Sequence, residues 1–281
     1  MRIGELDLQA GNTKIKVTGH HFDGVRRRNH AATLVVQLNG GSTLQGRNIY
    51  WEVFDWDVYQ QTKAIQVDYI RIGDLVTNLA PQPQRSAQHT HKPLPVIRIG
   101  RLDVNNIRFR QQSPAGGTWF DGHNISIQDL RTTDHYFTWG NADAVIDKIN
   151  WKKNDTQLET GPVTFSNHRE TVVNNISFSS NKGNGYTKLQ APQLVVNLPL
   201  HSSNIAGLAI NKLRMPAASL AIRKITDKDT LEVSSGLSLD AAGIHSAKDG
   251  QVKFHTLGLA MNNTRLAKGN LHAAIPAAKL D

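Results

Sequence analysis

The sequence contains no cysteine, which excludes disulfide frameworks, zinc–thiolate centres and thiol nucleophiles. No apolar stretch approaches the roughly 18 residues that cross a bilayer. The first residues, Met1 to Asp7, alternate charged and apolar side chains and do not form a signal peptide. There is also no nucleophile elbow, no phosphate-binding glycine loop and no His-Glu-x-x-His motif. The sequence therefore predicts no catalytic site, no cofactor and no metal.

Positive charge is in excess and is spread evenly. The chain has 32 Lys and Arg against 23 Asp and Glu, a net charge of +9, which favours acidic partners such as lipid head groups or nucleic acid. Residues 1–140 hold 16 basic and 12 acidic side chains, and residues 141–281 hold 16 and 11. Because no basic tail stands out, we expect no nucleic-acid partner. The run Arg26-Arg27-Arg28 is either a solvated turn or a contact to anionic head groups.

Apolar residues, 39% of the chain, recur mostly with period two, which is typical of strands with one wetter face. Such runs lie at 14–17, 34–38, 65–70, 124–127 and 194–200, with turn signals between them at positions such as 39–41 and 181–185. Helix is expected only as a short turn near 204–210 and at the ends of a few loops. The sequence predicts an all-β fold with a mainly antiparallel sheet.

Residues 81–95 interrupt this pattern, because they are rich in proline and polar side chains. We expect an exposed loop or linker there. It would separate an N-terminal part of the sheet, residues 1–80, from its continuation at 96–281. Both sides contain the same repeated motif, so we expect one continuous sheet rather than two independent domains.

That motif, Arg-Ile-Gly-x-Leu, occurs at 2–6, 71–75 and 98–102 and indicates internal repeats. In a regular strand its Ile and Leu would face opposite sides, so burying both requires an extra residue, as in a β-bulge. Gly100 is predicted to supply it with a positive φ, and Asn105-Asn106 to form a tight turn. A looser apolar spacing recurs at 146/149/151, 173/176/178, 210/213/215 and 254/257/259, although composition alone yields it in about 6% of windows.

The run from Ile97 to Phe109 and the run from Leu208 to Ile222 resemble the AsmA-like family of bacterial envelope proteins, of the AsmA and TamB type. The resemblance implies an elongated repeated-strand sheet curled into a groove, whose apolar concave side binds phospholipid acyl chains for lipid transport or outer-membrane assembly. It also implies a periplasmic location and contacts with envelope membrane proteins. Family members begin with a transmembrane helix, and none precedes Arg2, so we expect a segment of a longer protein anchored in the inner membrane.

The predicted lipid-binding residues are the apolar positions of two strand-like runs. They are Ile97, Ile99, Leu102, Val104, Ile107, Phe109, Leu194, Val196, Leu198 and Leu200. The same residues would also suit a closed core, because folding buries aliphatic side chains in any case. A β-solenoid adhesin or scaffold with such a core is therefore a second interpretation.

A third interpretation, a β-helical carbohydrate-active enzyme, depends on the aromatic and acidic run from Trp51 to Tyr59. Asp55 and Asp57 would be its acid and base. We favour an aromatic strand or loop at the sheet edge, because no second site is marked as a partner.

Histidines and asparagines offer two weaker signals. His20-His21 and His89-Thr90-His91 could each present two imidazoles, but no third ligand is nearby in the sequence. Asn124, Asn154 and Asn175 match glycosylation sequons, which we interpret as polar strand residues.

Overall fold

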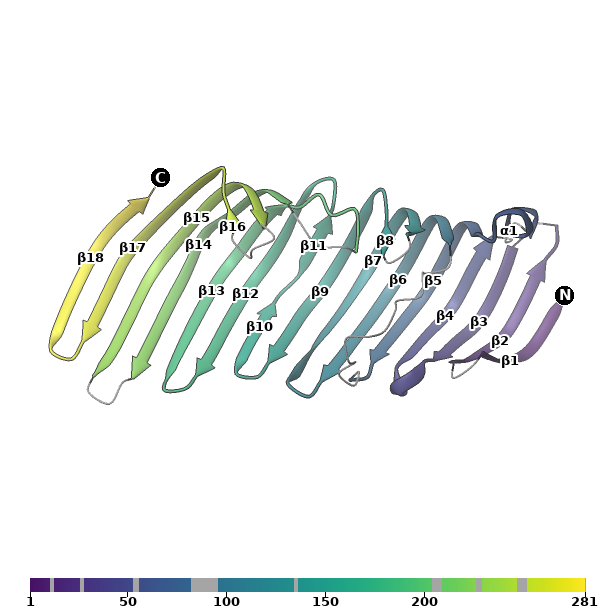
Figure 1. Cartoon of the computed structure of the whole chain (residues 1–281), viewed down its shortest axis with the longest axis horizontal. Coiled ribbons are helices and arrows are strands. Elements are labelled where there is room, and N and C mark those ends of the chain that lie inside the picture. The colour runs from purple at the N-terminus through teal and green to yellow at the C-terminus, as the bar shows by residue number, and fades with distance from the viewer. Residues whose placement is uncertain are drawn as a thin grey trace. The chain divides into compact units, whose positions relative to one another are not determined.

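The computed structural model describes residues 1–10, 13–25, 28–52, 56–81, 96–133, 136–203, 209–225, 229–246 and 252–280. Strands make up 82% of the structure and helix 3% (Figure 1). The prediction of an all-β fold is therefore confirmed. Contacts divide the chain into two compact units, residues 1–145 with 201–204, and residues 146–200 with 205–281.

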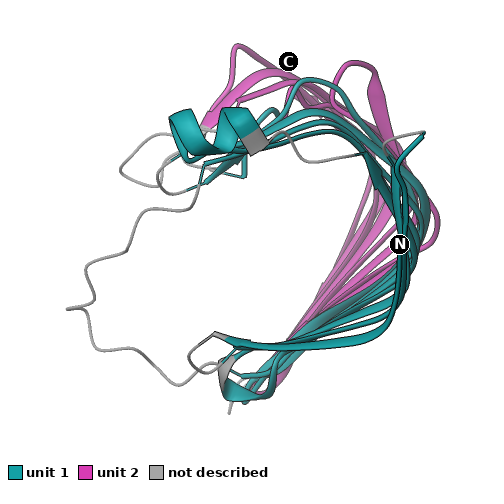
Figure 2. Cartoon of the chain, turned by 90° about the vertical axis from the view of Figure 1, so that its right-hand side faces the viewer, with its two compact units in different colours: residues 1–145, 201–204 teal, residues 146–200, 205–281 magenta. Residues whose placement is uncertain are grey.

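Unit 1 contains the first eight strands and the start of the ninth. They are β1 (Arg2–Ala10), β2 (Thr13–Asp23), β3 (Arg28–Gln37), β4 (Thr43–Glu52), β5 (Ile65–Leu79), β6 (Ile97–Ser113), β7 (Gly116–Thr132), β8 (Phe137–Thr138) and β9 (Ala142–Lys153). Strands β1 to β8 pair in chain order, antiparallel except for the parallel pair β5–β6. Figure 2 shows that the strands of unit 1 bend along their length into an arc.

The parallel pair has a consequence for residues 81–95. Because β5 and β6 are hydrogen-bonded neighbours, that segment connects two strands of one unit, and the boundary between the units follows Val145 instead. Pro81 is exposed, and residues 82–95 lie outside the described residues.

Unit 2 contains the rest of β9 and the remaining strands. They are β10 (Thr156–Thr160), β11 (Val163–Ser166), β12 (Glu170–Lys182), β13 (Gly185–Asn197), β14 (Ala209–Ile225), β15 (Thr230–Ser246), β16 (Val252–Lys253), β17 (Thr256–Lys268) and β18 (Leu271–Leu280). Antiparallel pairs link β9, β10, β12, β13, β14, β15, β17 and β18 in that order, with β11 on β12 and β16 on β15. Antiparallel hairpins of this kind are incompatible with a parallel β-helix.

Two local predictions differ from the structure. In the run from Trp51 to Tyr59, where we expected a strand or loop, Trp51 and Glu52 end β4 and a short helix, α1 (Trp56–Thr62), begins at Trp56; residues 53–55 lie outside the described residues. The strand expected at 194–200 ends at Asn197, before Pro199, whose ring removes a ladder donor. Of the helical turn expected at 204–210, only Ala209 and Ile210 are described, and they begin β14; residues 204–208 lie outside the described part. A 3-10 turn, η1, covers Asn39–Gly41.

The repeated motif bends the sheet, but not as predicted. Gly100 does not have a positive φ; the left-handed residue is Asp129 (φ 52°) on the neighbouring β7, at the position opposite Gly100. Asn105-Asn106 form no turn, because β6 continues without a break and Asn124 (φ 52°) takes the left-handed conformation opposite Asn105. A left-handed residue needs a side chain that tolerates it, and asparagine does.

This bend explains why Ile and Leu three residues apart face the same side. On β4, Asn48 has φ 51°, and a Cβ added to Gly46 would lie 2.8 Å from Cδ1 of Ile49. Gly46 and Ile49 therefore share a face although they are three positions apart. Leu75 and Ile72 of the motif pair with Gly46 and Ile49 across the β4–β5 ladder, so they share a face in the same way, with the left-handed residue on the neighbouring strand.

Candidate functional site

The residues predicted on β6 form one face of that strand. Val104 is buried, and the other five predicted residues, Ile97, Ile99, Leu102, Ile107 and Phe109, are half-buried. Between them, Arg98, Arg101 and Arg108 are exposed. The apolar face crosses both bend positions of β6 without changing sides.

Neighbouring strands extend this face across unit 1 in apolar rows. One row is Leu6, Val17, Leu34, Gly46, Leu75, Ile107 and Gly122. A second is Ala31, Ile49, Ile72, Val104 and Ile125, and a third is Trp51, Ile70, Leu102 and Ile127. On the same face, Phe109 of β6 stacks on Phe120 of β7 with ring centroids 4.9 Å apart. Cross-strand contacts of this kind stabilise a sheet.

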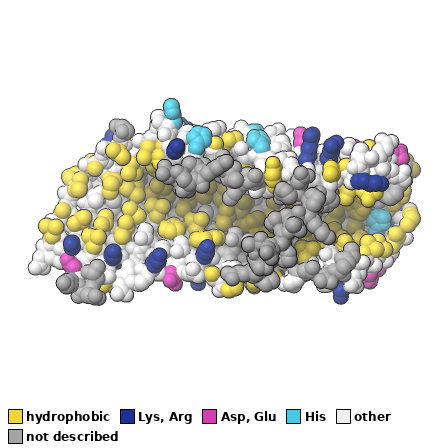
Figure 3. Space-filling model, in the orientation of Figure 1, with side chains coloured by type: hydrophobic (Ala, Val, Ile, Leu, Met, Phe, Trp, Pro, Cys, Tyr) yellow, Lys and Arg dark blue, Asp and Glu magenta, His cyan; other side chains and the backbone are white. Residues whose placement is uncertain are grey.

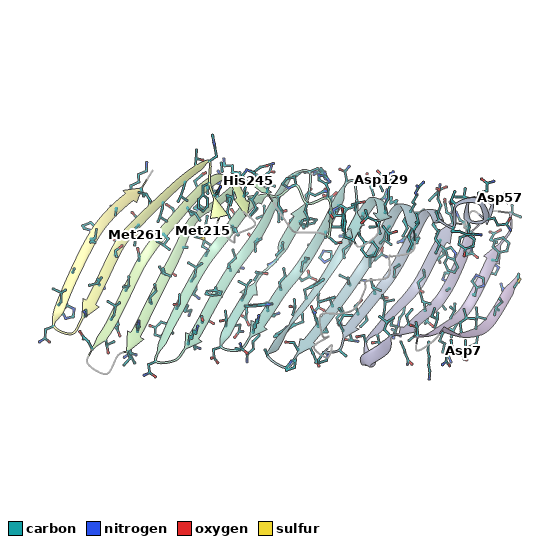
Figure 4. The ribbon with its side chains drawn as sticks, in the orientation of Figure 1. Asp7, Asp57, Asp129, Met215, His245 and Met261 are labelled. Carbon is teal, nitrogen blue, oxygen red and sulfur yellow. The ribbon has the colours of Figure 1, made fainter. Side chains whose placement is uncertain are left out.

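Unit 2 has a face of the same type. Its rows are Val196, Leu213, Ala241 and Leu257, and Met215, Leu239, Leu259 and Leu280; Met215 and Met261 are labelled on β14 and β17 in Figure 4. Figure 3 shows hydrophobic side chains gathered over the strands of this unit. Of the predicted residues, Leu194 and Val196 belong to β13, whereas Leu198 and Leu200 follow its end and are half-buried.

The looser apolar spacing marked positions that sequence reasoning did not assign to the site. Val173, Ile176 and Phe178 flank the left-handed Asn175 (φ 51°) on β12 and pair with Leu194, Ala191 and Leu189. The same spacing at 210/213/215 flanks the position opposite Gly243 (φ 60°). At these two places the weak pattern therefore reflects bends of the same kind.

These faces are not part of a closed core. Among the described residues, no large side chain is less than 2% exposed, and the buried hydrophobic residues are mostly Ala and Val. Packed cores of this chain length normally enclose many Leu, Ile and Phe side chains completely. In each unit the apolar face consequently remains partly accessible.

A polar cluster lies on the opposite face of β5 and β6. The Tyr69 hydroxyl donates to Asp103 Oδ2 at 3.0 Å, and Arg101 Nε donates to Asp103 Oδ1 at 3.0 Å. Burial raises the pKa of Asp103, but hydrogen bonds from Arg101, Ser126 and Tyr69 outweigh it and hold this pKa below its ordinary value. Burial and the bond to Asp103 raise the pKa of Tyr69. The cluster links β5, β6 and β7 by charge-assisted hydrogen bonds, so its role is to stabilise the sheet.

The other candidate residues do not form a chemical site. Asp57 lies on α1 (Figure 4), so it does not share a strand face with Asp55, which lies outside the described residues. His20 stacks on Trp51 with centroids 5.6 Å apart, and its Nε2 lies 3.1 Å from Asn29 Oδ1. His89 and His91 also lie outside. In the described part of the chain, no three His, Asp or Glu side chains are grouped as metal ligands would be.

The arginine run and the sequon asparagines were two further candidates from the sequence. Arg28 begins β3 and its Nη2 lies 3.8 Å from Glu52 Oε1, whereas Arg26 and Arg27 are outside the described residues. Asn124, Asn154 and Asn175 all have positive φ, between 50° and 52°. Backbone conformation thus accounts for the asparagine of each sequon.

Comparison of the chain with protein families, curated proteins and solved structures finds no match. No helix in the described residues is long and apolar enough to cross a bilayer. The likeness to the AsmA-like family therefore stays a prediction.

Proposed function

We propose that this chain binds phospholipid acyl chains on the apolar faces of its two units, as a non-enzymatic lipid-handling segment of a bacterial envelope. The observation behind the proposal is the accessible apolar face of each single-layered sheet. A closed-core scaffold would enclose its Leu, Ile and Phe side chains completely. Among the described residues, no large side chain is less than 2% exposed. Contiguous accessible apolar surface is typical of binding sites.

The bends supply the shape that such a ligand needs. Left-handed residues at Asn48, Asn124 and Asn175 let apolar positions on both sides of a bend face the same way. A sheet curved toward its apolar side contacts an acyl chain from several directions, and each buried methylene contributes about 0.8 kcal/mol. The exposed arginines on the other face of β6 remain in water. Lipid transport or outer-membrane assembly in the periplasm is the cellular role that this reading favours.

Photo-crosslinking tests the proposal directly. Crosslinking amino acids at Ile99 and Leu102 in unit 1, and at Leu213 and Met215 in unit 2, should label phospholipid in the purified protein. The same groups at Arg98, Arg108 and Arg214, which are exposed neighbours on the same strands, are the matched controls and should not. A well-folded preparation that neither contains nor labels lipid would contradict the proposal and favour the scaffold interpretation.

A further inference from the structure

One end of unit 2 combines lysines and exposed apolar side chains on three successive hairpins. Strand pairing places residues of β12 to β18 in a single row across the sheet. In order these are Lys182, Gly185, Lys224, Leu231, Lys268 and Leu271. Lysine therefore occurs on every second strand, and with about 4.8 Å between strands the three lysines recur about every 10 Å.

Each of the three hairpins also exposes a large apolar side chain. Tyr186 is 41% exposed, Ile225 is 42% exposed and Leu271 is 62% exposed. They belong to the hairpins β12–β13, β14–β15 and β17–β18, in which Lys182, Lys224 and Lys268 lie. Figure 1 shows these hairpins turning at the same end of unit 2, and Figure 3 shows Lys and Arg side chains along that rim. We call these six residues the lysine rim.

Two acidic side chains near the rim already have partners. Glu232 forms an ion pair with Arg223 at 3.1 Å, and Asp229 Oδ1 accepts the backbone N–H of Thr230 at 2.9 Å. The three lysines themselves are exposed. Because they are exposed, their charge can reach an external anion.

We propose that the lysine rim docks unit 2 on the surface of an anionic bilayer. Lysines near such a surface are attracted to its phosphates, and tyrosine and aliphatic side chains insert at the boundary between head groups and acyl chains. A soluble polyanion would use the lysines but would have no use for three exposed apolar side chains on the same hairpins. The combination favours a membrane surface.

Vesicle flotation tests the docking with the full chain. Protein should float with vesicles of phosphatidylcholine plus phosphatidylglycerol and remain below vesicles of phosphatidylcholine alone. The triple variant Lys182→Ala, Lys224→Ala, Lys268→Ala should lower the partition coefficient about a hundredfold, near fivefold for each lysine. The control variant Lys148→Ala, Lys212→Ala, Lys253→Ala removes the same charge from exposed positions outside the rim and should change it only a few-fold.

A second pair of variants tests the apolar component. Leu271→Ser should weaken flotation and Leu271→Trp should strengthen it, whereas Phe254→Ser, at a 46% exposed residue outside the rim, should have no effect. Equal losses in the two lysine variants would mean that net charge alone matters and would overturn the proposal. So would tight binding to soluble polyphosphate together with indifference to Leu271. This inference does not depend on acyl-chain binding on the apolar faces. A triple lysine variant that still retains lipid but no longer floats with anionic vesicles would distinguish membrane docking from acyl-chain binding.

Discussion

Gly73 lies across the β4–β5 ladder from Asn48, and a Cβ added to Gly73 would come within 3.0 Å of the Asn48 Cβ. Asn48 has φ 51°. The other two copies of the motif show the same relationship: Gly4 is opposite Gly19 (φ 62°) and Gly100 is opposite Asp129 (φ 52°). The glycine of the repeat therefore marks the place where the neighbouring strand bends.

The three copies should not tolerate a side chain equally. At Gly100 an added Cβ would lie 2.7 Å from the backbone oxygen of Asp68, whereas at Gly4 it would meet nothing within 4 Å. Because this oxygen is backbone of the neighbouring strand β5 and not the end of a flexible side chain, Gly100→Ala should destabilise the protein by roughly 1–3 kcal/mol. Gly4→Ala is the matched control and should have little effect. Urea unfolding of both variants measures the difference; equal midpoints would contradict the close approach.

Asn48 should be replaceable by glycine but not by valine. Glycine adopts positive φ without steric cost, while a β-branched residue there should cost about 1–2 kcal/mol. We expect Asn48→Gly to unfold at a urea concentration near that of the wild type and Asn48→Val at a lower one. If both variants matched the wild type, Asn48 would not be held in the left-handed region.

An aspartate at Ile99 distinguishes an accessible apolar face from a closed core. On an accessible face the carboxylate remains hydrated, so Ile99→Asp should stay folded and lose bound lipid. In a closed core an unpaired carboxylate costs several kcal/mol and the unit would unfold. Circular dichroism and lipid extraction report the two outcomes, and Arg98→Asp, on the exposed face of the same strand, controls for charge.

Acid should weaken the hydrogen bonds that Tyr69 and Arg101 make to Asp103. The folded-state pKa of this carboxyl lies below its ordinary value of 3.8. Its contribution to the free energy of unfolding is therefore complete above pH 3.8 and is lost as the pH falls through the lower folded-state pKa. Asp103→Asn should lower the unfolding free energy by roughly 1–2 kcal/mol at neutral pH. The difference in unfolding free energy between the wild type and the variant should become smaller below about pH 4. A gap independent of pH would show that the charge of Asp103 is irrelevant.

Period-two patterning was sufficient to predict strands, because alternate residues of a strand face opposite sides whatever the strand pairs with. The same reasoning placed Ile99 and Leu102 on one face, but the β-bulge predicted between them is absent, because β6 keeps an unbroken register with β5 and β7 there. It also separated the apolar positions of β6 from Arg98, Arg101 and Arg108. Composition excluded any chemistry that depends on cysteine.

Pairing between strands decided the rest. Which strand contains the left-handed residue depends on what lies opposite, so Asp129, almost 30 positions from Gly100, could not be identified from the motif itself. The parallel pair β5–β6 joins segments separated by residues 81–95, and the lysine rim exists only because three hairpins bring Lys182, Lys224 and Lys268 into one row. Local periodicity determines which side chains share a face, whereas register between distant strands, set by backbone hydrogen bonds, determines which of them become neighbours.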